Sequence, residues 1–212
     1  MKPSFIVLCG GEGSGKSTAT ELIKRKYLPN VIFTREPGGS TFAEKIRDLM
    51  FKEPLAKHAN AATMFGLAWA SRAEHMMRTV IPALMRETPV VCDRFDCCTY
   101  AYQIYAQGGS TLTDLFWTTR DTFLSERKPD LYIFLDVSPA EGLRRVAGRP
   151  GKKSHFDEQD IAFHHKVREG YLAFFKELSA RGGQSVMIDA SQSQDQVGTA
   201  ILAAVAPFLK EY

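Results

Sequence analysis

The chain has 212 residues, 44% hydrophobic and 24% charged, a composition typical of a globular protein that can bury a sizeable core. Its net charge of +3, from 27 basic and 24 acidic residues, is too balanced to indicate a nucleic-acid or membrane partner. No run approaches the roughly 20 apolar residues of a membrane span, and the apolar part of MKPSFIVLCGG is too short for a signal peptide.

Five short runs of consecutive apolar residues are expected to form strands that are covered on both faces. These strands are expected at 5–9, 31–34, 89–92, 131–137 and 186–189. Helical periodicity predicts helices between them, at 16–28, 41–51, 60–86, 112–126, 139–147, 158–180 and 194–210. Because strand and helix alternate along the whole chain, the sequence predicts one α/β domain over residues 1–212 with a parallel sheet.

The four cysteines fit no common zinc-binding spacing. Cys9 and Cys92 end apolar runs and are expected to be small core residues, with a redox or disulfide role as the alternative. Cys97 and Cys98 complete the set. Structural thiols favour a reducing, cytoplasmic location.

The segment CGGEGSGKST, residues 9–18, carries the first motif with a chemical meaning. Gly10, Gly15, Lys16 and Ser17 fit the pattern G-x-x-x-x-G-K-[ST], with an expected strand before it and an expected helix after it. Such a loop directs backbone N–H groups and a helix N-terminus at phosphates, while the lysine neutralises phosphate charge and the hydroxyl binds Mg²⁺. The motif predicts nucleoside triphosphate and magnesium binding, but it does not separate a kinase from a GTPase-type switch or a motor. The expected ATP contacts are Gly10, Gly11, Gly13, Ser14, Gly15, Lys16, Ser17 and Thr18.

Further segments, taken together with the phosphate loop, resemble the thymidylate kinase family of the bacterial and phage kind over almost the whole chain. They are TREPGG (34–39), FAEKIRDLM (42–50), SRAEHMMRTVIPAL (71–84), CDRFDCCTYAYQ (92–103), KPDLYIFLDV (128–137) and IDAS (188–191). The resemblance implies the nucleoside-monophosphate-kinase version of the P-loop NTPase fold, a five-stranded parallel sheet flanked by helices, with a mobile lid. It also implies a homodimer that phosphorylates dTMP to dTDP with ATP and Mg²⁺, and with no nucleic-acid or membrane partner.

Phosphoryl transfer to a nucleotide brings two polyanions together, so arginines that cancel repulsion and fix geometry are needed. The resemblance places the acceptor phosphate on Arg47, with Arg94 near the same phosphate. Asp93 ends an expected strand at the edge where α/β folds bind ligands, and it matches the family residue that orients magnesium beside Ser17.

The resemblance also assigns a pocket for the base and the sugar. Arg72 matches the arginine that binds the thymine O4 edge, Thr99 the contact on the N3/O4 side, and Tyr102 the ring that disfavours a ribose 2′-OH. Glu12 matches an acidic loop residue that accepts from the acceptor 3′-OH, with loop stabilisation as the alternative. The remaining residues expected there are Glu36, Pro37, which matches a proline that is often cis, and Gln103.

One position departs from the family pattern. The phenylalanine that usually stacks on thymine, four residues before Arg72, is replaced by Ala68. Phe65 shares a helical face with Ala68 and Arg72, and Trp69 is rotated from Ala68 by about 100°. Either Phe65 or Trp69 is expected to supply the stack, or the pocket has more room and suits a larger 5-substituent, as in 5-hydroxymethyl-dUMP. Packing in the core is the alternative role for both aromatic rings.

The polar stretch AGRPGKKSHFDE (147–158) is expected to belong to a basic lid at about 145–158. The phosphate loop has no additional cation, so the charge that reaches the transferring phosphoryl group is expected from this lid. Arg149 is the first candidate and Arg145 the second. The family often has Asp-Arg where this chain has Ser154 and His155.

Two other functions compete with a dTMP kinase. A deoxynucleoside kinase also has a phosphate loop and an Asp-Arg motif, but it needs a general base, whereas REPGG and Arg47 favour a phosphate acceptor. A GTPase-type switch predicts an N/T-K-x-D motif, which the sequence lacks.

Overall fold

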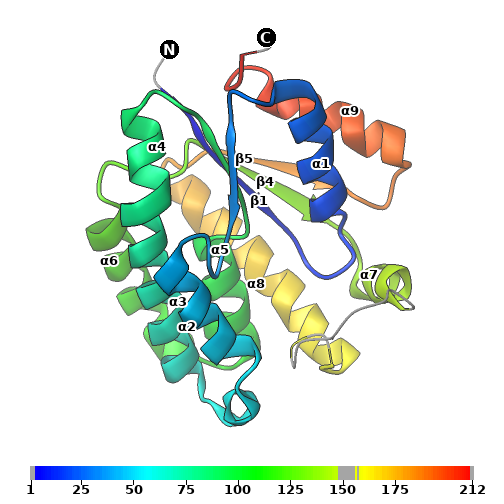
Figure 1. The fold of residues 1–212 in the computed structure, drawn as a ribbon. Helices are drawn as coiled ribbons and strands as arrows, with labels where there is room; N and C mark the ends of the chain where they lie inside the picture. The colour runs from blue at the N-terminus through cyan, green and yellow to red at the C-terminus, as the bar shows by residue number, and fades with distance from the viewer. Residues whose placement is uncertain (1–2, 148–155, 157, 211–212) are drawn as a thin grey trace.

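The computed structural model describes residues 3–147, 156 and 158–210. The core of the molecule is a parallel sheet of five strands in the order β2-β3-β1-β4-β5 (Figure 1). The strands are β1 (Phe5–Cys9), β2 (Ile32–Arg35), β3 (Val90–Asp93), β4 (Leu131–Asp136) and β5 (Ser185–Asp189). This confirms the predicted α/β class, and each strand lies within one residue of its predicted ends.

Helices cover both faces of the sheet. The α-helices of the described chain are α1 (Lys16–Tyr27), α2 (Thr41–Phe51), α3 (Ala61–His75), α4 (Ile81–Met85), α5 (Asp96–Thr99), α6 (Thr113–Leu124), α7 (Pro139–Val146), α8 (Ile161–Ala180) and α9 (Gln194–Val205). Short 3₁₀ turns are η1 (Pro54–His58) and η4 (Ser110–Leu112), and wider π-helical turns are η2 (Met76–Val80) and η3 (Tyr100–Ala106).

Several helices begin where a polar side chain accepts a hydrogen bond from the first turn. Asn60 does so for α3, Asp160 for α8, and Ser193 for α9, where Gln196 completes a reciprocal capping box. Helix α1 differs, because its N-cap is Gly15 in a left-handed conformation with no capping side chain. Its first N–H groups are therefore available to a bound anion.

Alternation of side chains along β1 divides the interior into two cores. Phe5, Val7 and Cys9 face the core formed with α3, α6 and α8, whereas Ile6 and Leu8 face the core formed with α1 and α9. All five residues are fully buried. Figure 1 shows α1 and α9 on one side of the sheet and the larger group of helices on the other.

The cysteines belong to this interior. All four are free, with Cys9, Cys92 and Cys97 buried and Cys98 half-buried. Burial raises the pKa of the Cys9 and Cys92 thiols, which keeps them protonated. Their environment fits the predicted structural role.

The helix predicted at 60–86 is interrupted by η2, which precedes Pro82 in α4. A proline inside an α-helix lacks its N–H and clashes with the carbonyl four residues earlier. In this wider turn the N–H of Ile81 reaches back five residues to the carbonyl of Met76. The interruption therefore lets one helical rod continue through the proline (Figure 1).

Two further features differ from the sequence-based expectation. A helical run from 96 to 106, formed by α5 and η3, was not predicted. Strand β5 was expected to be covered on both faces, which is wrong because it is an edge strand: Val186 is 38% exposed and Met187 54%, and of its five residues Ile188 alone is buried.

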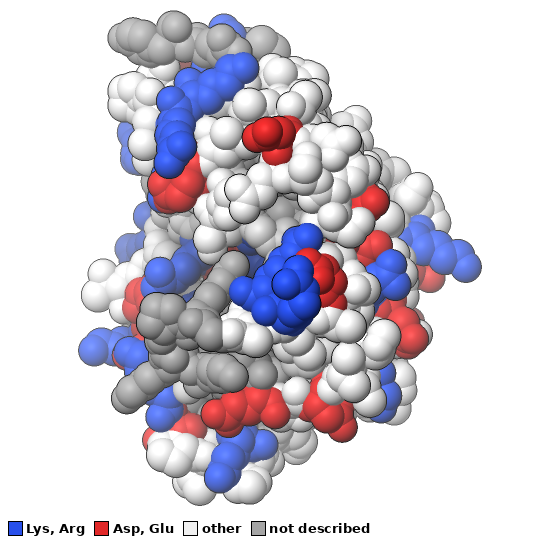
Figure 2. Space-filling view, turned by 90° about the vertical axis from the view of Figure 1, so that its right-hand side faces the viewer, with Lys and Arg blue, Asp and Glu red and all other residues white. Residues whose placement is uncertain are grey.

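Surface charge is mixed on the face shown in Figure 2, where basic and acidic side chains alternate over the described residues. Several charged side chains of the described residues pair along single helices, as Lys24 does with Glu21 and Arg144 with Glu141. No helix among the described residues has the length and apolar character needed to cross a bilayer.

Candidate active site

The phosphate loop joins β1 to α1, as predicted. Its glycines at 10, 13 and 15 have φ values of 152°, 68° and 91°, which residues with a Cβ rarely adopt. The Lys16 ammonium lies over this loop, where Nζ donates to the carbonyl oxygens of Gly10 at 2.9 Å and Gly11 at 2.7 Å. Burial and the nearby charge of Arg94 hold the pKa of Lys16 below its ordinary value. Ser14 is buried beside Lys16, and Ser17 and Thr18 are exposed at the start of α1.

The loop packs directly against α7. A Cβ placed on Gly13 would overlap the carbonyl oxygen of Gly142, and one placed on Gly142 would overlap the carbonyl oxygen of Glu12. From the same helix, Arg145 donates to the carbonyl oxygen of Ala190 at 2.8 Å and pairs with Glu141 at 2.7 Å. Arg145 is therefore held beside the phosphate loop.

The end of β3 brings the Asp-Arg pair, Asp93 and Arg94, to the phosphate loop. Arg94 has a backbone φ of 67°, in the left-handed region that a non-glycine residue seldom occupies. Its N–H continues the sheet ladder by donating to Leu8, and its guanidinium donates to Glu12 at 2.6 Å. Burial alone would raise the pKa of Glu12, but the charges of Arg94 and Lys16 outweigh it and lower that pKa. Glu12 is therefore an ionised partner that orients Arg94.

Asp93 fits a role beside a magnesium ion. Its Oδ1 is buried and has no hydrogen-bond partner within the described chain. A buried carboxylate oxygen needs a compensating partner, and a metal-bound water supplies a strong donor. Ser17 offers its hydroxyl from the exposed start of α1. The described residues hold no cluster of three or more His, Cys, Asp or Glu ligands, so a metal here needs phosphate and water oxygens to complete its shell.

A cavity of about 790 Å³ opens beside the loop, within the size range of small-molecule sites of about 300–1,000 Å³. It is lined by Glu12, Glu36, Pro37, Arg47, Met50, Phe51, Lys52, Ala68, Arg72, Arg94, Phe95, Cys98, Thr99, Tyr102, Gln103 and Phe156. The structure thus gathers residues from the loop, α2, α3, the turn after β3, α5 and η3 that were assigned to one pocket from the sequence.

Arg47 and Arg94 are the cationic part of this wall. Arg47 donates to the carbonyl oxygen of Pro37 at 2.8 Å, and its guanidinium lies 5.0 Å from the ring centroid of Phe51. The peptide bond between Glu36 and Pro37 is cis. Two guanidinium groups facing one cavity suit an anionic ligand such as a phosphate.

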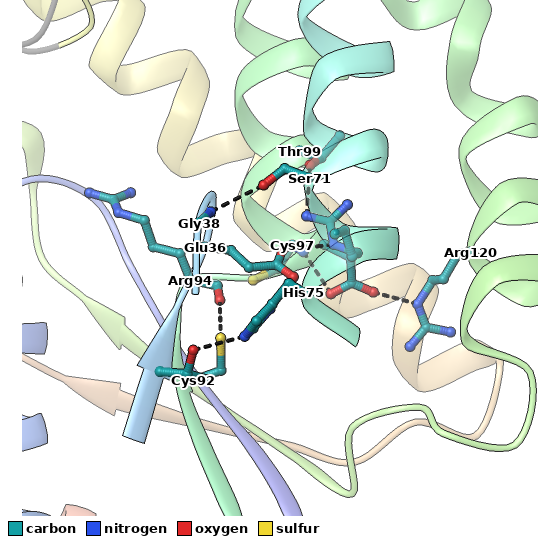
Figure 3. A network of polar contacts seen from close by, with 12 residues as sticks. Glu36, Gly38, Ser71, His75, Cys92, Arg94, Cys97, Thr99 and Arg120 are labelled. Carbon is teal, nitrogen blue, oxygen red and sulfur yellow. Dashed lines mark hydrogen bonds and ion pairs between the residues drawn. The ribbon is translucent and has the colours of Figure 1, made fainter. Parts of the chain in front are cut away.

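Arg72 is almost fully buried at the other end of the cavity. Its Nε donates to Glu36 at 2.8 Å and its Nη2 to Thr99 at 3.1 Å, whereas Nη1 is buried without a partner in the described chain. Figure 3 shows that Glu36 and Thr99 belong to different elements. The free donor of Arg72 is suited to an acceptor atom on a ligand, because a buried unpaired donor is costly.

The cavity wall also holds residues that the resemblance assigned to the sugar and the base. Tyr102 lies 7% exposed, with ring contacts to Phe156 and Tyr171, and Gln103 donates to Gln107 at 3.1 Å. Ala68 lines the cavity, but the structure does not bring Phe65 and Trp69 to its wall. Trp69 instead packs against Phe65, Phe116 and Phe123 in the core beneath α3.

Sequence reasoning missed several wall residues. Phe95 belongs to the Asp-Arg-Phe segment, so the signal was present but unassigned. Met50 and Cys98 lie within quoted motifs, Phe51 and Lys52 directly follow one, and Phe156 comes from the predicted lid stretch. Arg149, the first candidate for contact with the transferring phosphoryl group, falls outside the described residues, as do Ser154 and His155.

Comparisons with known proteins agree with this geometry. Residues 9–201 match the family model described as thymidylate kinase. A curated thymidylate kinase from Vibrio campbellii (strain ATCC BAA-1116) is 37% identical over 215 residues, covering 99% of this chain and 98% of that protein. The crystal structure of thymidylate kinase from Ehrlichia chaffeensis matches with a TM-score of 0.70 and 27% identity, covering 97% of this chain and 99% of that one. These matches span the loop, the cavity and the sheet.

Proposed function

The chain belongs to the thymidylate kinase family, and we propose that it transfers the γ-phosphoryl group of ATP to the 5′-phosphate of dTMP, giving ADP and dTDP. The observation that carries this proposal is the contact between Arg94 and Glu12 at 2.6 Å, because it joins the phosphate loop to the wall of the large cavity. A triphosphate on the loop and a monophosphate in the cavity would then meet at Arg94.

The residues around that meeting point provide charge and positioning. A 5′-phosphate is already anionic, so the reaction needs no base to deprotonate it, and catalysis comes from alignment and charge neutralisation. Lys16 would bind the β/γ-phosphates and Arg47 the acceptor phosphate. Arg94 would lie between donor and acceptor. Glu12 would keep Arg94 oriented and also accept from the acceptor 3′-OH.

Magnesium is assigned to Ser17 and Asp93. The ion neutralises charge on the β- and γ-phosphates when bound. The Ser17 hydroxyl would bind it directly, and the unpartnered Asp93 Oδ1 would accept from one of its waters. Arg149 stays the proposed cation for the transferring group, with Arg145 as the second candidate.

The nucleoside would lie against Arg72, Thr99 and Tyr102. The unpaired Nη1 of Arg72 suits the O4 atom of thymine, and the Tyr102 ring would oppose a 2′-hydroxyl. Glu36 and Gln103 would complete the polar wall around the nucleoside. Ala68 lines the cavity and neither Phe65 nor Trp69 does, so space would remain next to the base.

A coupled assay for ADP release tests the proposal. We expect turnover with ATP, Mg²⁺ and dTMP, and loss of turnover when EDTA removes the metal. Thymidine in place of dTMP is the control, because it has the same base and sugar but no phosphate for Arg47. Faster phosphorylation of thymidine than of dTMP would instead support a deoxynucleoside kinase.

We also propose that the chain forms a homodimer through the exposed apolar side chains of η2, α4 and α6. Exposed apolar side chains support this: Met77 is 64% exposed and Met85 71% in η2 and α4, and Leu115 and Phe123 are about half exposed in α6. Light scattering on a sizing column should give twice the monomer mass. The double variant Met77→Glu, Met85→Glu should give the monomer mass, and a monomeric unmodified protein would refute the proposal.

A further inference from the structure

A fully buried histidine lies behind the cavity without forming part of its wall. His75 is the last residue of α3, is 0% exposed and is absent from the cavity lining. Both of its ring nitrogens have polar partners: Nδ1 lies 2.9 Å from Oε1 of Glu36, and Nε2 lies 2.8 Å from Oγ1 of Thr34 (Figure 3).

The chemistry of the partners fixes the direction of these hydrogen bonds. The ionised carboxylate of Glu36 only accepts, so Nδ1 of His75 carries a proton and donates it. In the neutral ring, Nε2 then accepts from the hydroxyl of Thr34, which can donate. The histidine therefore connects strand β2 to Glu36 through a defined sequence of donors and acceptors.

Glu36 links His75 to Arg72, because its carboxylate contacts both side chains. One carboxylate oxygen of Glu36 accepts from His75 and the other accepts from Nε of Arg72 at 2.8 Å. A guanidinium is a rigid planar fork, so fixing Nε on Glu36 and Nη2 on Thr99 also fixes the direction of Nη1. The free donor of Arg72 is thus aimed by Glu36 and Thr99, which line the cavity, and behind Glu36 by His75, which does not.

Gly39 leaves room for the imidazole, because it has no side chain. Gly39 has φ 83°, and a Cβ added to it would lie 2.5 Å from Cδ2 of His75 and 2.6 Å from Oγ1 of Thr34. The carbonyl oxygen of Gly39 is in turn held by the hydroxyl of Thr79 at 2.7 Å. The ring is therefore fixed in one orientation by the chain that covers it.

We infer that His75 is a positioning residue for the acceptor base, acting through Glu36 to aim the free Nη1 of Arg72. This inference rests on the proposed function, in which that donor meets the O4 atom of thymine. It predicts that loss of the contact between His75 and Glu36 weakens binding of the monophosphate and leaves ATP binding intact, since the relay touches no residue of the phosphate loop.

Two substitutions at one position separate this role from simple packing. In His75→Asn the amide nitrogen stands as many bonds from Cα as Nδ1, so it can still donate to Glu36. In His75→Gln the amide replaces Nε2 and reaches Thr34, but the donor to Glu36 is lost. Both variants remove the ring, so the loss of function that they share measures the packing of the ring. The difference between them measures the link from His75 through Glu36 to Arg72.

Steady-state kinetics with dTMP and ATP provide the readout. We expect the KM for dTMP to rise about tenfold or more in His75→Gln, and to stay within about threefold of the unmodified value in His75→Asn. The KM for ATP should change less than about twofold in both. The preference for dTMP over dCMP, which has an amino group in place of O4, should fall in His75→Gln alone.

Thermal unfolding would show whether the glutamine variant folds. If it does not, substitutions at Thr34 still test the inference. Thr34→Val removes the partner of Nε2 with little change in shape and should raise the KM for dTMP by about two- to fivefold, whereas Thr34→Ser should behave like the unmodified protein. Equal effects of the asparagine and glutamine variants, or a parallel rise in the KM for ATP, would overturn the inference. Failure of the unmodified protein to phosphorylate dTMP would instead reject the proposed function, so the two failures are distinguishable.

Discussion

Glu12 and Arg94 form an ion pair of 2.6 Å although 82 positions separate them in the chain. Glu12 belongs to the loop after β1, and Arg94 follows β3, the neighbour of β1 in the sheet. The parallel register places both residues at the same edge, where open α/β sheets bind ligands. The pair therefore stands between the phosphate loop and the large cavity.

The pH dependence of stability tests this pair. The pKa of Glu12 is lowered in the folded protein, so the pair stabilises the fold above the unfolded pKa of about 4.3, and this stabilisation is lost as pH falls through the lower folded pKa. Glu12→Gln should reduce the free energy of unfolding by about 1 kcal/mol at pH 7. Urea unfolding should show this difference constant from pH 6 to 8 and shrinking below about pH 4.5. A difference that stays constant down to pH 3 would contradict the assignment.

Lys16 should be indispensable for turnover. Removing a cation that stabilises the transferring phosphoryl group costs about 3–4 kcal/mol, so Lys16→Ala should lower kcat by two to three orders of magnitude. Lys24→Ala is the control, because Lys24 lies on the same helix and its ammonium contacts Glu21 and the ring of Phe33, neither of which belongs to the phosphate loop. Near-normal rates in the Lys16 variant would remove the phosphate loop from the mechanism.

Arg47 should act on the acceptor and not on the donor. Arg47→Ala removes a charge-assisted contact to the acceptor phosphate, and we expect the KM for dTMP to rise about thirtyfold, or about 2 kcal/mol. The KM for ATP should stay nearly constant. Lys45→Ala removes an exposed cation from the same helix and serves as the control. A larger effect on ATP than on dTMP would reverse the assignment.

Tyr102 should govern the choice between deoxyribose and ribose. Tyr102→Ala should reduce the preference for dTMP over the ribonucleotide of thymine by about tenfold, because the ring no longer opposes a 2′-hydroxyl. Tyr102→Phe keeps the ring and should keep the preference. The ratio of kcat/KM for the two nucleotides measures the effect, and an unchanged ratio in the alanine variant would exclude a steric filter at this residue.

Ala68 should determine the space beside the base. Ala68→Phe places a ring on the cavity wall, so kcat/KM for 5-hydroxymethyl-dUMP should fall several-fold relative to that for dTMP. Ala70→Phe adds the same ring at an exposed position two residues away and should leave the ratio unchanged. Equal losses for both nucleotides would show that Ala68 affects packing without affecting selectivity.

The features that the sequence predicted best are local in the chain. The phosphate loop lies between a strand and a helix that are adjacent in sequence, so spacing alone defines it, and the strands show as apolar runs. The run from 96 to 106 was missed because its buried face carries Asp96, Thr99 and Gln103, which interrupt hydrophobic periodicity. Its polar residues are buried because they meet partners or line the cavity.

Contacts between residues far apart in the chain could not be predicted from the sequence. Asp96 is fully buried against Arg120 at 2.6 Å and Tyr132 at 2.8 Å, yet nothing in the spacing of these residues identifies them as partners. His75 and Glu36 are a second case, separated by 39 positions. Such pairs arise from the packing of helices on the sheet, which a one-dimensional pattern does not specify.

The stacking partner of the base shows a different kind of limit. Helical periodicity placed Phe65 on the face of Ala68 and Arg72, and it placed Trp69 about 100° away. The structure puts Trp69 against Phe116 and Phe123 of α6, with ring centroids 5.8 Å apart in both pairs. A neighbouring helix therefore decided the direction of these rings, and local spacing did not.

The division of the interior by β1 has a consequence for how this enzyme can be altered. The compartment under α1 and α9 is separated by a layer of backbone from the compartment that contains Ala68, Phe95 and Tyr102. Changes at well-separated sites usually add. Substitutions on one side of the sheet can therefore change nucleotide preference. Substitutions on the other side, for instance around Ile23 and Val205, can restore lost stability, and the two sets of effects should add.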